Sequence, residues 1–578
     1  MPKENNKMQV DIENLFKQNA NDLSSIKELY NKLKEVEEKI TQVKYIDNTL
    51  VKKLKKEYEK LKKLILDENI QIKITNDIET IISQLGHKAN DIVTLSDFIG
   101  TNNYEKLKNA ILFCKNNNKT LYLNNEIDIL GYLNIECNII GKSKINLTTN
   151  NIDISENVTI DGLTFDGKFN CGRVNVIGNN VKIINCIFTD FMSYDQKEGT
   201  KQLSIYKNVK NCIVKNCVFE NLKPKLTNNV TGDEIGMCQS IMVFGGTSNI
   251  IISNNIFKGI ENTEDSDYIR VYGETVTNTN FPYNYADVNI KYGVTGVDIT
   301  DNTFYSPTKS AVKIQGDSVI VRNNTLIIDK DCALGIRCHH STNVKIIDNK
   351  IMYKDGLFIN SPIMCDGSYN VLIKKNYVEL YSTTTTAYKT LYKIVSSDLI
   401  EIADNTLISH DILSNFIQNC TNVSVSNEKI SGQSLEFQGC TNIICKNIEF
   451  LHNNTSSTTP YIKLENNTNI TIDNIKFSDS TRYILFSNGK YSNTNVKISN
   501  LYVTSNIKTG SSILMVYDGT DSISNISIHN IPDLYNDSFN CGTTAKRPNA
   551  KFILRDGHKY FDTDLKKEIV YKNGTWIV

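Results

Sequence analysis

The sequence predicts an all-β solenoid, a right-handed parallel β-helix, and three observations support this fold class. A phrase of Asn followed by alternating apolar residues recurs along the chain, with starts that include Asn343, Asn370, Asn422, Asn442, Asn469 and Asn495. These starts are 27, 52, 20, 27 and 26 residues apart, and the longest interval holds another copy from Asp398. A period of roughly 20–30 residues is typical of a solenoid. Period-two alternation rich in Val and Ile indicates strands, and the leucine template of the alternative, a leucine-rich repeat, is absent.

The Asn that begins each phrase stands where the chain must bend between strands, because Asn tolerates the left-handed backbone conformation. We expect stacked Asn side chains of successive coils to hydrogen-bond to one another. A single coil is too small to bury its own apolar face, so many coils must stack. The chain has only 8 prolines, which fits strands that donate along their whole ladder.

Composition narrows the function classes. The 578 residues include 64 Lys and Arg and 64 Asp and Glu, so the formal net charge is zero. This balance argues against a general nucleic-acid binder or a membrane-surface protein. No apolar run is long enough to span a membrane, and the start MPKENNKMQV lacks the apolar stretch of a signal peptide. We therefore expect folding in a cytoplasm, no membrane insertion and no nucleic-acid partner.

Fourteen cysteines also need an explanation. Cys186, Cys212 and Cys217 lie within strand phrases, and Cys420 and Cys440 precede equivalent phrases. Recurrence at one position of the repeat predicts a ladder of small buried side chains. No pair of C-x-x-C motifs at zinc spacing is present, so we expect structural thiols and no metal site.

Residues 22–68 are expected to form an elongated stalk. From Ile26 to Leu64 apolar residues follow steps of three and four, interrupted by Asp47 and Glu57, which predicts a coiled coil over residues 22–68. The alternative is a single amphipathic helix packed on a domain, and the number of strands stays open. Residues 1–21 are expected to be a flexible or virion-docking tip. Residues 69–92 are expected to form a neck with a short helix.

The β-helix is expected over residues 93–538. It opens with strand, helix and strand, and the first full strand is Thr120 to Leu123. The helix would cap the open end of the solenoid and cover strand edges that otherwise recruit other chains. Its apolar stripe is Leu107, Ala110, Ile111 and Cys114.

This opening resembles a known family. SDFIG, the helix, KTLYL and IIGKSKINL are similar to the N-terminal module of pectate-lyase-like β-helix proteins, which include pectin-degrading enzymes and many phage tail spikes and appendages. The acidic, glycine-rich turn of that pattern is replaced by residues 100–104. The resemblance therefore implies the fold and does not imply pectinolytic activity.

Residues 539–578 are expected to form a small C-terminal β-hairpin module. GTTAKRP and KYFDTDLKKEIVYKNGTWIV resemble a module that ends tail fibres and tail spikes of phages infecting low-GC Gram-positive bacteria. Asn573-Gly574 predicts a tight hairpin turn, with Trp576 on the return strand. The module would plug the solenoid, close a trimer or bind a surface.

Together these resemblances imply a phage tail spike or tail appendage. It would be a homotrimer on the virion tail, assembled in the host cytoplasm. Its N-terminal end would attach to other tail or baseplate proteins. Its shaft would bind a host cell-surface polysaccharide such as capsule, teichoic acid or another wall glycan.

Between Phe188 and Val297 the copies of the Asn phrase lie farther apart than elsewhere. We expect loops between them, over 189–204, 222–238 and 258–295. Loops on a rigid scaffold commonly carry function. A glycosidase needs two carboxylates, and a lyase needs a base and a cation that neutralises a uronate. The catalytic candidates are Glu234, Asp265, Asp267 and Arg270.

Aromatic rings stack on sugars, and Arg and His suit anionic groups. Arg337 and His339 alternate along one expected strand, so both side chains would face outward. The glycan-binding candidates are Tyr283, Tyr285, Arg337 and His339.

Three functions stay open: a spike that depolymerises its glycan as hydrolase or lyase, a non-enzymatic receptor-binding or structural fibre, and a bacterial polysaccharide lyase or hydrolase. No cofactor is expected, apart from Ca²⁺ if the chain is a lyase.

Overall fold

The computed structural model describes the chain from residue 92 onward, with gaps. The predicted tip, coiled coil and neck lie outside the described residues. The described ranges are 92–170, 172–192, 200–223, 238–261, 266–273, 293–329, 332–353, 358–380, 390–451, 461–477, 484–486, 493–503, 514–516, 527–529, 541–542, 559–562, 564–572 and 575–578.

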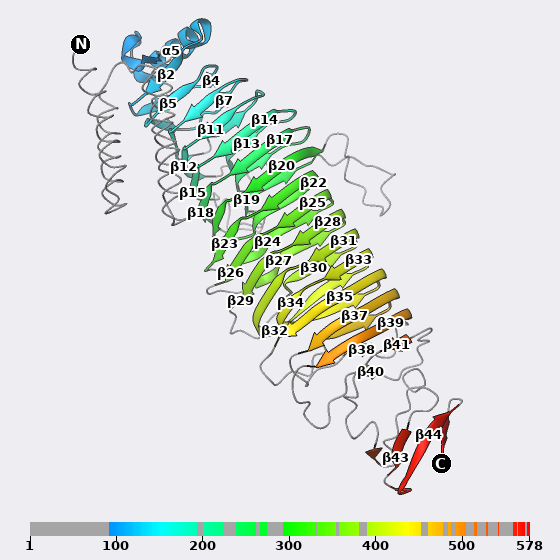
Figure 1. Cartoon of the computed structure of the whole chain (residues 1–578). Helices are drawn as coiled ribbons and strands as arrows, with labels where there is room; N and C mark the ends of the chain where they lie inside the picture. Colours follow the sequence, from blue (N-terminus) through cyan, green and yellow to red (C-terminus); the bar gives the residue numbers. More distant parts are fainter. Residues whose placement is uncertain are drawn as a thin grey trace, which may run out of the picture.

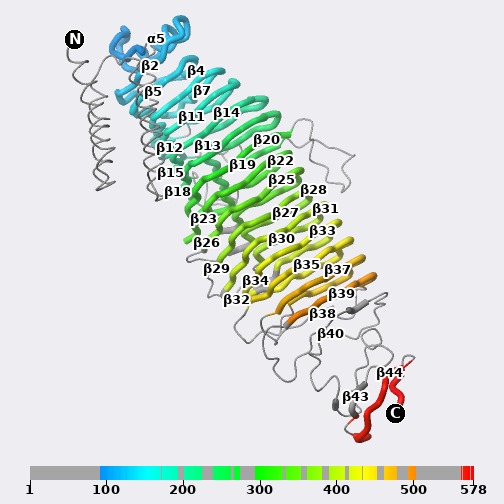
Figure 2. Tube along the Cα trace, in the orientation of Figure 1, coloured from blue at the N-terminus to red at the C-terminus, as the bar shows by residue number. Residues whose placement is uncertain are grey.

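Within these ranges, 41 strands form one continuous parallel sheet. Each strand pairs with strands one coil away, as β2 with β5 and β5 with β8. Most of these partners are not consecutive in the chain; β1 with β2 and β34 with β35 are the exceptions. The chain is therefore a parallel β-helix, as the Asn phrase predicted. Figures 1 and 2 show the coils stacked in chain order from blue to orange.

Each coil contributes strands to three faces, named here A, B and C in the order in which the chain passes through them. Face A holds β1 (Ile92–Thr94), β2 (Thr120–Leu123), β5 (Ile139–Gly141), β8 (Thr159–Asp161), β11 (Lys182–Ile184), β14 (Lys210–Lys215), β17 (Ser248–Ser253), β20 (Val294–Thr300), β25 (Thr342–Ile347), β28 (Tyr369–Lys374), β31 (Asp398–Ala403), β33 (Thr421–Ser426) and β41 (Ser527–His529). Face B holds β3 (Ile127–Ile129), β6 (Lys144–Leu147), β9 (Thr164–Asn170), β12 (Ile187–Met192), β15 (Val218–Lys223), β18 (Ile256–Ile260), β21 (Thr303–Tyr305), β23 (Thr325–Ile328), β26 (Lys350–Tyr353) and β29 (Tyr377–Leu380).

Face C is the face on which the candidate site lies. It holds β4 (Leu133–Ile135), β7 (Ile152–Ile154), β10 (Val174–Val176), β13 (Thr200–Ile205), β16 (Cys238–Val243), β19 (Ser266–Tyr272), β24 (Cys332–His339), β27 (Phe358–Asp366), β30 (Tyr392–Val395), β36 (Ile462–Glu465), β38 (Ile484–Phe486) and β40 (Leu514–Val516). Six long strands turn a corner and serve two faces: β22 (Ser310–Arg322), β32 (Thr406–Gln418), β34 (Lys429–Gln438), β35 (Thr441–Leu451), β37 (Thr468–Phe477) and β39 (Thr494–Val503).

The N-terminal coils are covered as predicted. After the short 3-10 helix η1 (Leu95–Asp97), helix α5 (Asn103–Asn117) packs against β1, β2 and β3. The side chain of Asn102 accepts a hydrogen bond from the Glu105 N–H, which caps the helix. Its buried residues are those of the predicted stripe: Leu107, Ala110, Ile111 and Cys114. In the described part of the chain no helix is both long and apolar enough to cross a membrane.

The Asn residues behave as the sequence indicated. Asn442, Asn469 and Asn495 begin strand phrases and all have φ between 55° and 58°, in the left-handed region. The Asn442 amide donates to Asn422 (2.9 Å), the Asn469 amide to Asn442 (2.9 Å) and the Asn495 amide to Asn469 (2.8 Å). The left-handed bend and the ladder between coils are both confirmed.

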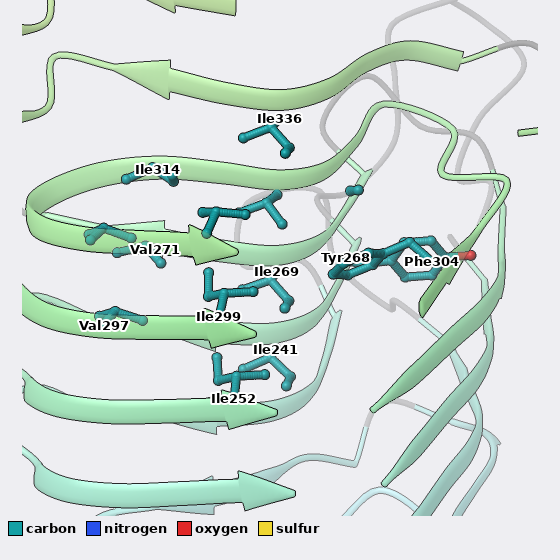
Figure 3. Packing of buried hydrophobic residues seen from close by; sticks show 14 of the residues in the cluster. Ile241, Ile252, Tyr268, Ile269, Val271, Val297, Ile299, Phe304, Ile314 and Ile336 are labelled. Atoms are coloured by element: carbon teal, nitrogen blue, oxygen red, sulfur yellow. The ribbon is translucent and has the colours of Figure 1, made fainter. Parts of the chain in front are cut away.

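Apolar side chains fill the interior between the three faces. On face B, five phenylalanines of successive coils stack with ring centroids 4.7–5.0 Å apart: Phe165, Phe188, Phe219, Phe257 and Phe304. Figure 3 shows Tyr268 of face C beside Phe304, and Ile241, Ile269 and Ile336 pointing into the same core. Burial of this continuous core stabilises coils that could not fold singly.

The predicted cysteine ladder is present. The N–H of Cys186 donates to the sulfur of Cys217 (3.4 Å), and the N–H of Cys420 donates to the sulfur of Cys440 (3.5 Å). Cys212 is also buried, but it lies on β14 in another column. All eleven cysteines whose side chains are described are buried free thiols.

The C-terminal residues form a separate sheet of β42 (Cys541–Gly542), β43 (Lys559–Asp562), β44 (Lys567–Lys572) and β45 (Thr575–Ile577). Strands β44 and β45 pair antiparallel, with Tyr571 opposite Trp576. Their rings meet edge to face at 5.2 Å. The predicted hairpin with Trp576 on its return strand is confirmed.

One prediction was wrong. The segments 189–204 and 258–295, expected as loops, contain the regular strands β13 and β19. The Asn phrase covers only faces A and B of each coil, because its two strands lie on either side of the A–B corner. The strands of face C do not contain the Asn phrase. Loops were therefore predicted from the sequence where face C strands are present.

Candidate functional site

Apart from the segment that holds α5, the two longest segments between consecutive strands of the β-helix each adjoin a face C strand in the sequence. Residues 224–237 come between β15 and β16, and residues 274–292 come between β19 and β20. Both segments join a face C strand to a neighbouring face. Because additions to a regular scaffold commonly carry binding or catalysis, face C near β16–β24 is the first place to look for a site.

A column of cations lies on this part of face C. Register places Arg270 of β19 beside Lys313 of β22, and Lys313 beside Arg337 of β24. Each cation stands between two buried residues that face the core; Figure 3 shows Ile269 and Val271 turned inward. Since side chains alternate along a strand, the cations face outward. We call Arg270, Lys313 and Arg337 the cation column.

The described strands of face C carry more cations than carboxylates. From β13 to β30 its described strands carry five cations, Lys201, Arg270, Lys313, Arg337 and Lys393, and two carboxylates, Asp267 and Asp366.

The first carboxylate, Asp267, lies at the β19 end of the column. It is fully buried, and Arg270 is only 7% exposed. One oxygen of Asp267 is 3.9 Å from the Arg270 guanidinium, which also lies over the ring of Tyr272 at 5.0 Å. Both residues were expected on an exposed loop; β19 instead holds them in a defined register.

The second carboxylate, Asp366, lies at the β24 end. It accepts hydrogen bonds from Arg337 and from Nδ1 of His339, both at 2.8 Å. Burial opposes its ionisation, but the His339 hydrogen bond and the Arg337 charge outweigh this, so the pKa of Asp366 is below its ordinary value. The predicted alternation holds: Arg337 and His339 are 21% and 26% exposed, with buried Cys338 between them.

Aromatic rings lie beside the cations. Tyr206, Phe244 and Tyr272 follow one another at the ends of β13, β16 and β19, one position beyond or at the last strand residue. The rings of Tyr206 and Phe244 are 5.6 Å apart, and the Lys201 ammonium is 5.9 Å from the Phe244 ring. We call these three residues the aromatic column. A ring face beside polar groups is suited to stacking on a sugar.

On β22 and β24, three polar atoms make no hydrogen bond within the described structure. They are Ser310 Oγ, Gln315 Oε1 and Arg337 Nε, and each atom is buried. Ser310 pairs in register with Asp267, and Gln315 pairs with Tyr272. Buried polar groups are normally satisfied, so these exceptions on two adjacent strands of face C are consistent with a ligand that supplies partners.

The predicted candidates divide into two sets. Asp267, Arg270, Arg337 and His339 lie on face C, while Glu234, Asp265, Tyr283 and Tyr285 lie outside the described residues. Sequence reasoning missed Lys313, Asp366 and the aromatic column. A usable signal existed for Lys313: the triplets IRV, VKI and IRC repeat a cation between two apolar residues, and register aligns them.

No metal centre is built from the residues that are described: nowhere do three His, Cys, Asp or Glu side chains gather as a metal site.

Sequence comparison matches no family model and no curated protein. Structure comparison finds tailspike proteins of E. coli bacteriophage HK620. A double mutant is 11% identical with a TM-score of 0.45, covering 76% of this chain and 80% of that chain. The tailspike in complex with a pentasaccharide is 13% identical with a TM-score of 0.42, covering 76% and 80%. At these values the similarity carries no argument about what this chain binds.

Proposed function

We propose that this chain is the shaft of a bacteriophage tail spike or tail appendage, and that face C binds a polysaccharide of the host cell surface. The aromatic column beside the cation column carries the binding part of this proposal. Rings offer a flat apolar surface for sugar rings, and charged and polar groups beside them fix orientation. The resemblances of the two ends of the β-helix to phage tail modules support the assignment to a virion.

The remaining parts of the proposal rest on those resemblances. The chain would act as a homotrimer on the virion tail. Its N-terminal end would attach to other tail or baseplate proteins, and the host glycan would be capsule, teichoic acid or another wall polymer. The low-GC Gram-positive host rests on the C-terminal resemblance alone.

Binding without cleavage is the version that the described residues favour. Asp267 and Asp366 are separated by three strand spacings, at least about 14 Å, whereas the paired carboxylates of glycosidases are about 5–10 Å apart. These two residues therefore do not form a hydrolytic pair. A hydrolase that used Asp267 would need a second carboxylate near it, for which Glu234 and Asp265 are the candidates.

The experiment is incubation of the purified protein with capsular and wall polysaccharides from candidate hosts. Reducing ends, absorbance of unsaturated uronates and released phosphate report cleavage, and a pull-down on intact cells reports binding. We expect binding with no new product. A product would make the chain a depolymerase and name its reaction, and absence of binding to every polysaccharide and every cell would refute the proposal.

A further inference from the structure

Helix α5 covers the N-terminal end of the β-helix (Figure 1), and part of its outer side is apolar. Ile99, in the turn before the helix, is 90% exposed, and Leu112 and Phe113 on α5 are 56% and 39% exposed. We call these three residues the cap patch. Single exposed apolar side chains are common on protein surfaces, so what matters is whether these three lie together.

Two contacts place the three residues of the cap patch together. The side-chain amide of Asn109 donates to the carbonyl oxygen of Ile99 at 2.8 Å. Asn109 precedes Leu112 and Phe113 by three and four residues, the spacing that makes side chains neighbours on one side of a helix. The ring of Phe113 also meets the ring of Phe98 edge to face at 5.4 Å, and Phe98 packs against the core. The folded cap therefore fixes the position of the patch.

The turn that carries Ile99 is also held on the helix. The Glu105 carboxylate accepts hydrogen bonds from the N–H and the hydroxyl of Thr101, at 2.9 and 2.6 Å. An ordered apolar side chain that faces water loses little entropy when a second apolar surface covers it, and the hydrophobic effect favours that contact. The cap patch is thus suited to docking of another apolar surface.

We propose that residues 76–86 of the same chain form a helix whose apolar face packs on the cap patch. The sequence predicts this helix, because Asn76 and Glu79 have the spacing of a reciprocal cap and Gly86 is suited to the end of a helix. Its apolar residues recur at steps of three and four and therefore share one face: Ile78, Ile81, Ile82 and Leu85. So short a helix is not stable alone in water, so its apolar face needs a surface that covers it.

The length of the connection brings the two surfaces within reach of each other. Residues 87–91 separate the predicted helix from β1, and a segment of this length spans at most about 18 Å. Helix α5 packs against β1 and is about 22 Å long. The connection can therefore reach the cap but not the distant coils. A tether this short raises the effective concentration to roughly millimolar, which favours the same chain over a second copy as the occupant.

Docked in this way, residues 76–86 join the predicted coiled coil of residues 22–68 to the shaft and restrict bending between them. A force on the stalk would then be transmitted to the β-helix through the cap. This docking involves no residue of face C, so its failure would leave the proposed binding of polysaccharide intact.

Hydrogen exchange of the full chain, read by mass spectrometry of peptides from residues 69–91, tests the docking. We expect protected amides within residues 80–85 of the wild-type protein. Ile99→Asp and Leu112→Asp place a charge on the cap patch and should speed exchange of these amides on the order of tenfold or more. Ile177→Asp is the matched control, since Ile177 is 42% exposed and follows β10, and it should change their exchange by less than about twofold.

Photo-cross-linking identifies which chain occupies the patch. A chain with a photoreactive amino acid at position 112 is produced together with an excess of a chain in which Thr80→Ser lowers the mass of the neck peptide. We expect cross-links from position 112 to the neck peptide with Thr80, which comes from the same chain. Cross-links mainly to the lighter peptide would show that a second copy occupies the patch and would overturn the proposal.

Three other results would also overturn it: unprotected amides in the wild-type protein, protection that both patch variants leave intact, and absence of any cross-link to residues 76–86. Leu112→Met keeps an apolar side chain and should retain the protection. Loss of protection in Leu112→Met and Ile177→Asp alike would contradict a specific contact. Thermal unfolding of the β-helix should be the same in all four variants, because each change is at an exposed position.

Discussion

Glu428 ends an internal ladder of amide side chains and makes the stability of the β-helix depend on pH. Each Asn of this ladder donates its side-chain amide to the Oδ1 of the Asn one coil further on, at 2.9–3.0 Å; the members are Asn255, Asn302, Asn324, Asn349, Asn376 and Asn405. Asn405 donates its N–H and its amide to Oε1 of Glu428, both at 2.9 Å. A carboxyl group thus takes the place of an amide in an apolar interior.

Burial raises the pKa of Glu428 from its ordinary value of 4.5 to about 8, although the hydrogen bonds from Asn405 oppose this. Below pH 4.5 the folded and unfolded chains both hold the proton, so the residue costs nothing. As pH rises from 4.5 to 8 only the folded chain keeps it, and stability falls. At about 1.4 kcal/mol for each pKa unit, the loss is about 5 kcal/mol by pH 8 and about 3 kcal/mol at pH 7.

Glu428→Gln keeps the acceptor for Asn405 and removes the charge. We expect the variant to be more stable than wild type by about 3 kcal/mol at pH 7 and to match it near pH 4.5. Urea unfolding from pH 5 to 9 measures this, and hydrogen exchange of the Asn405 amide measures it locally, since coils open separately in a solenoid. Glu401→Gln, exposed on β31, is the control and should follow wild type. Parallel pH curves for wild type and Glu428→Gln would refute the reasoning.

Three further predictions follow from the same structure. Asn349→Ala removes the acceptor of Asn324 in the buried ladder and should lower the free energy of unfolding in urea by on the order of 3–5 kcal/mol. Asn343→Ala, at an exposed position with φ 52°, should lower it by about 1 kcal/mol. Equal losses in the two variants would contradict the buried ladder. Thiol titration of the native protein should find no more than three reactive groups, because eleven of the fourteen cysteines are buried, and a larger number would show that the core opens. Because the pKa of Asp366 is lowered in the folded chain, its contribution to stability is present at neutral pH and is lost as pH falls through that pKa; Asp366→Asn should therefore flatten the acid limb of the unfolding curve, and an unchanged limb would show that Arg337 and His339 do not stabilise the carboxylate.

The repeat could be predicted from the sequence because Asn recurs where the backbone takes the left-handed conformation. Asn in the left-handed region begins phrases such as those at Asn442 and Asn469, and each phrase spells out the strands of faces A and B. The second Asn of the phrase, as at Asn349, forms the internal ladder, and Glu428 stands at the same position in NEKI. This second position was not singled out from the sequence. Local patterns of this kind need no knowledge of register.

The site was harder to predict because it exists only through register between coils. Arg270 and Lys313 are 43 residues apart in the chain, and the segment 274–292 between them hides their alignment. Asp366 reaches Arg337 from the following coil, 29 residues away. Arg337 and His339 were predicted to face outward together because alternation within one strand is local. Their carboxylate partner required the pairing of β24 with β27.

The central claim, that sugar rings lie on the aromatic column of face C, is tested most directly by two matched tyrosines. Tyr206 on face C and Tyr305 at the end of β21 on face B are each 40% exposed. The comparison uses the capsular or wall polysaccharide that the wild-type protein binds with the highest affinity. Its affinity should be measured for wild type, Tyr206→Ala and Tyr305→Ala. We predict that Tyr206→Ala weakens binding by about tenfold and that Tyr305→Ala leaves it unchanged. Equal binding by Tyr206→Ala and wild type, or an equal loss in both variants, would contradict the placement of the glycan on face C.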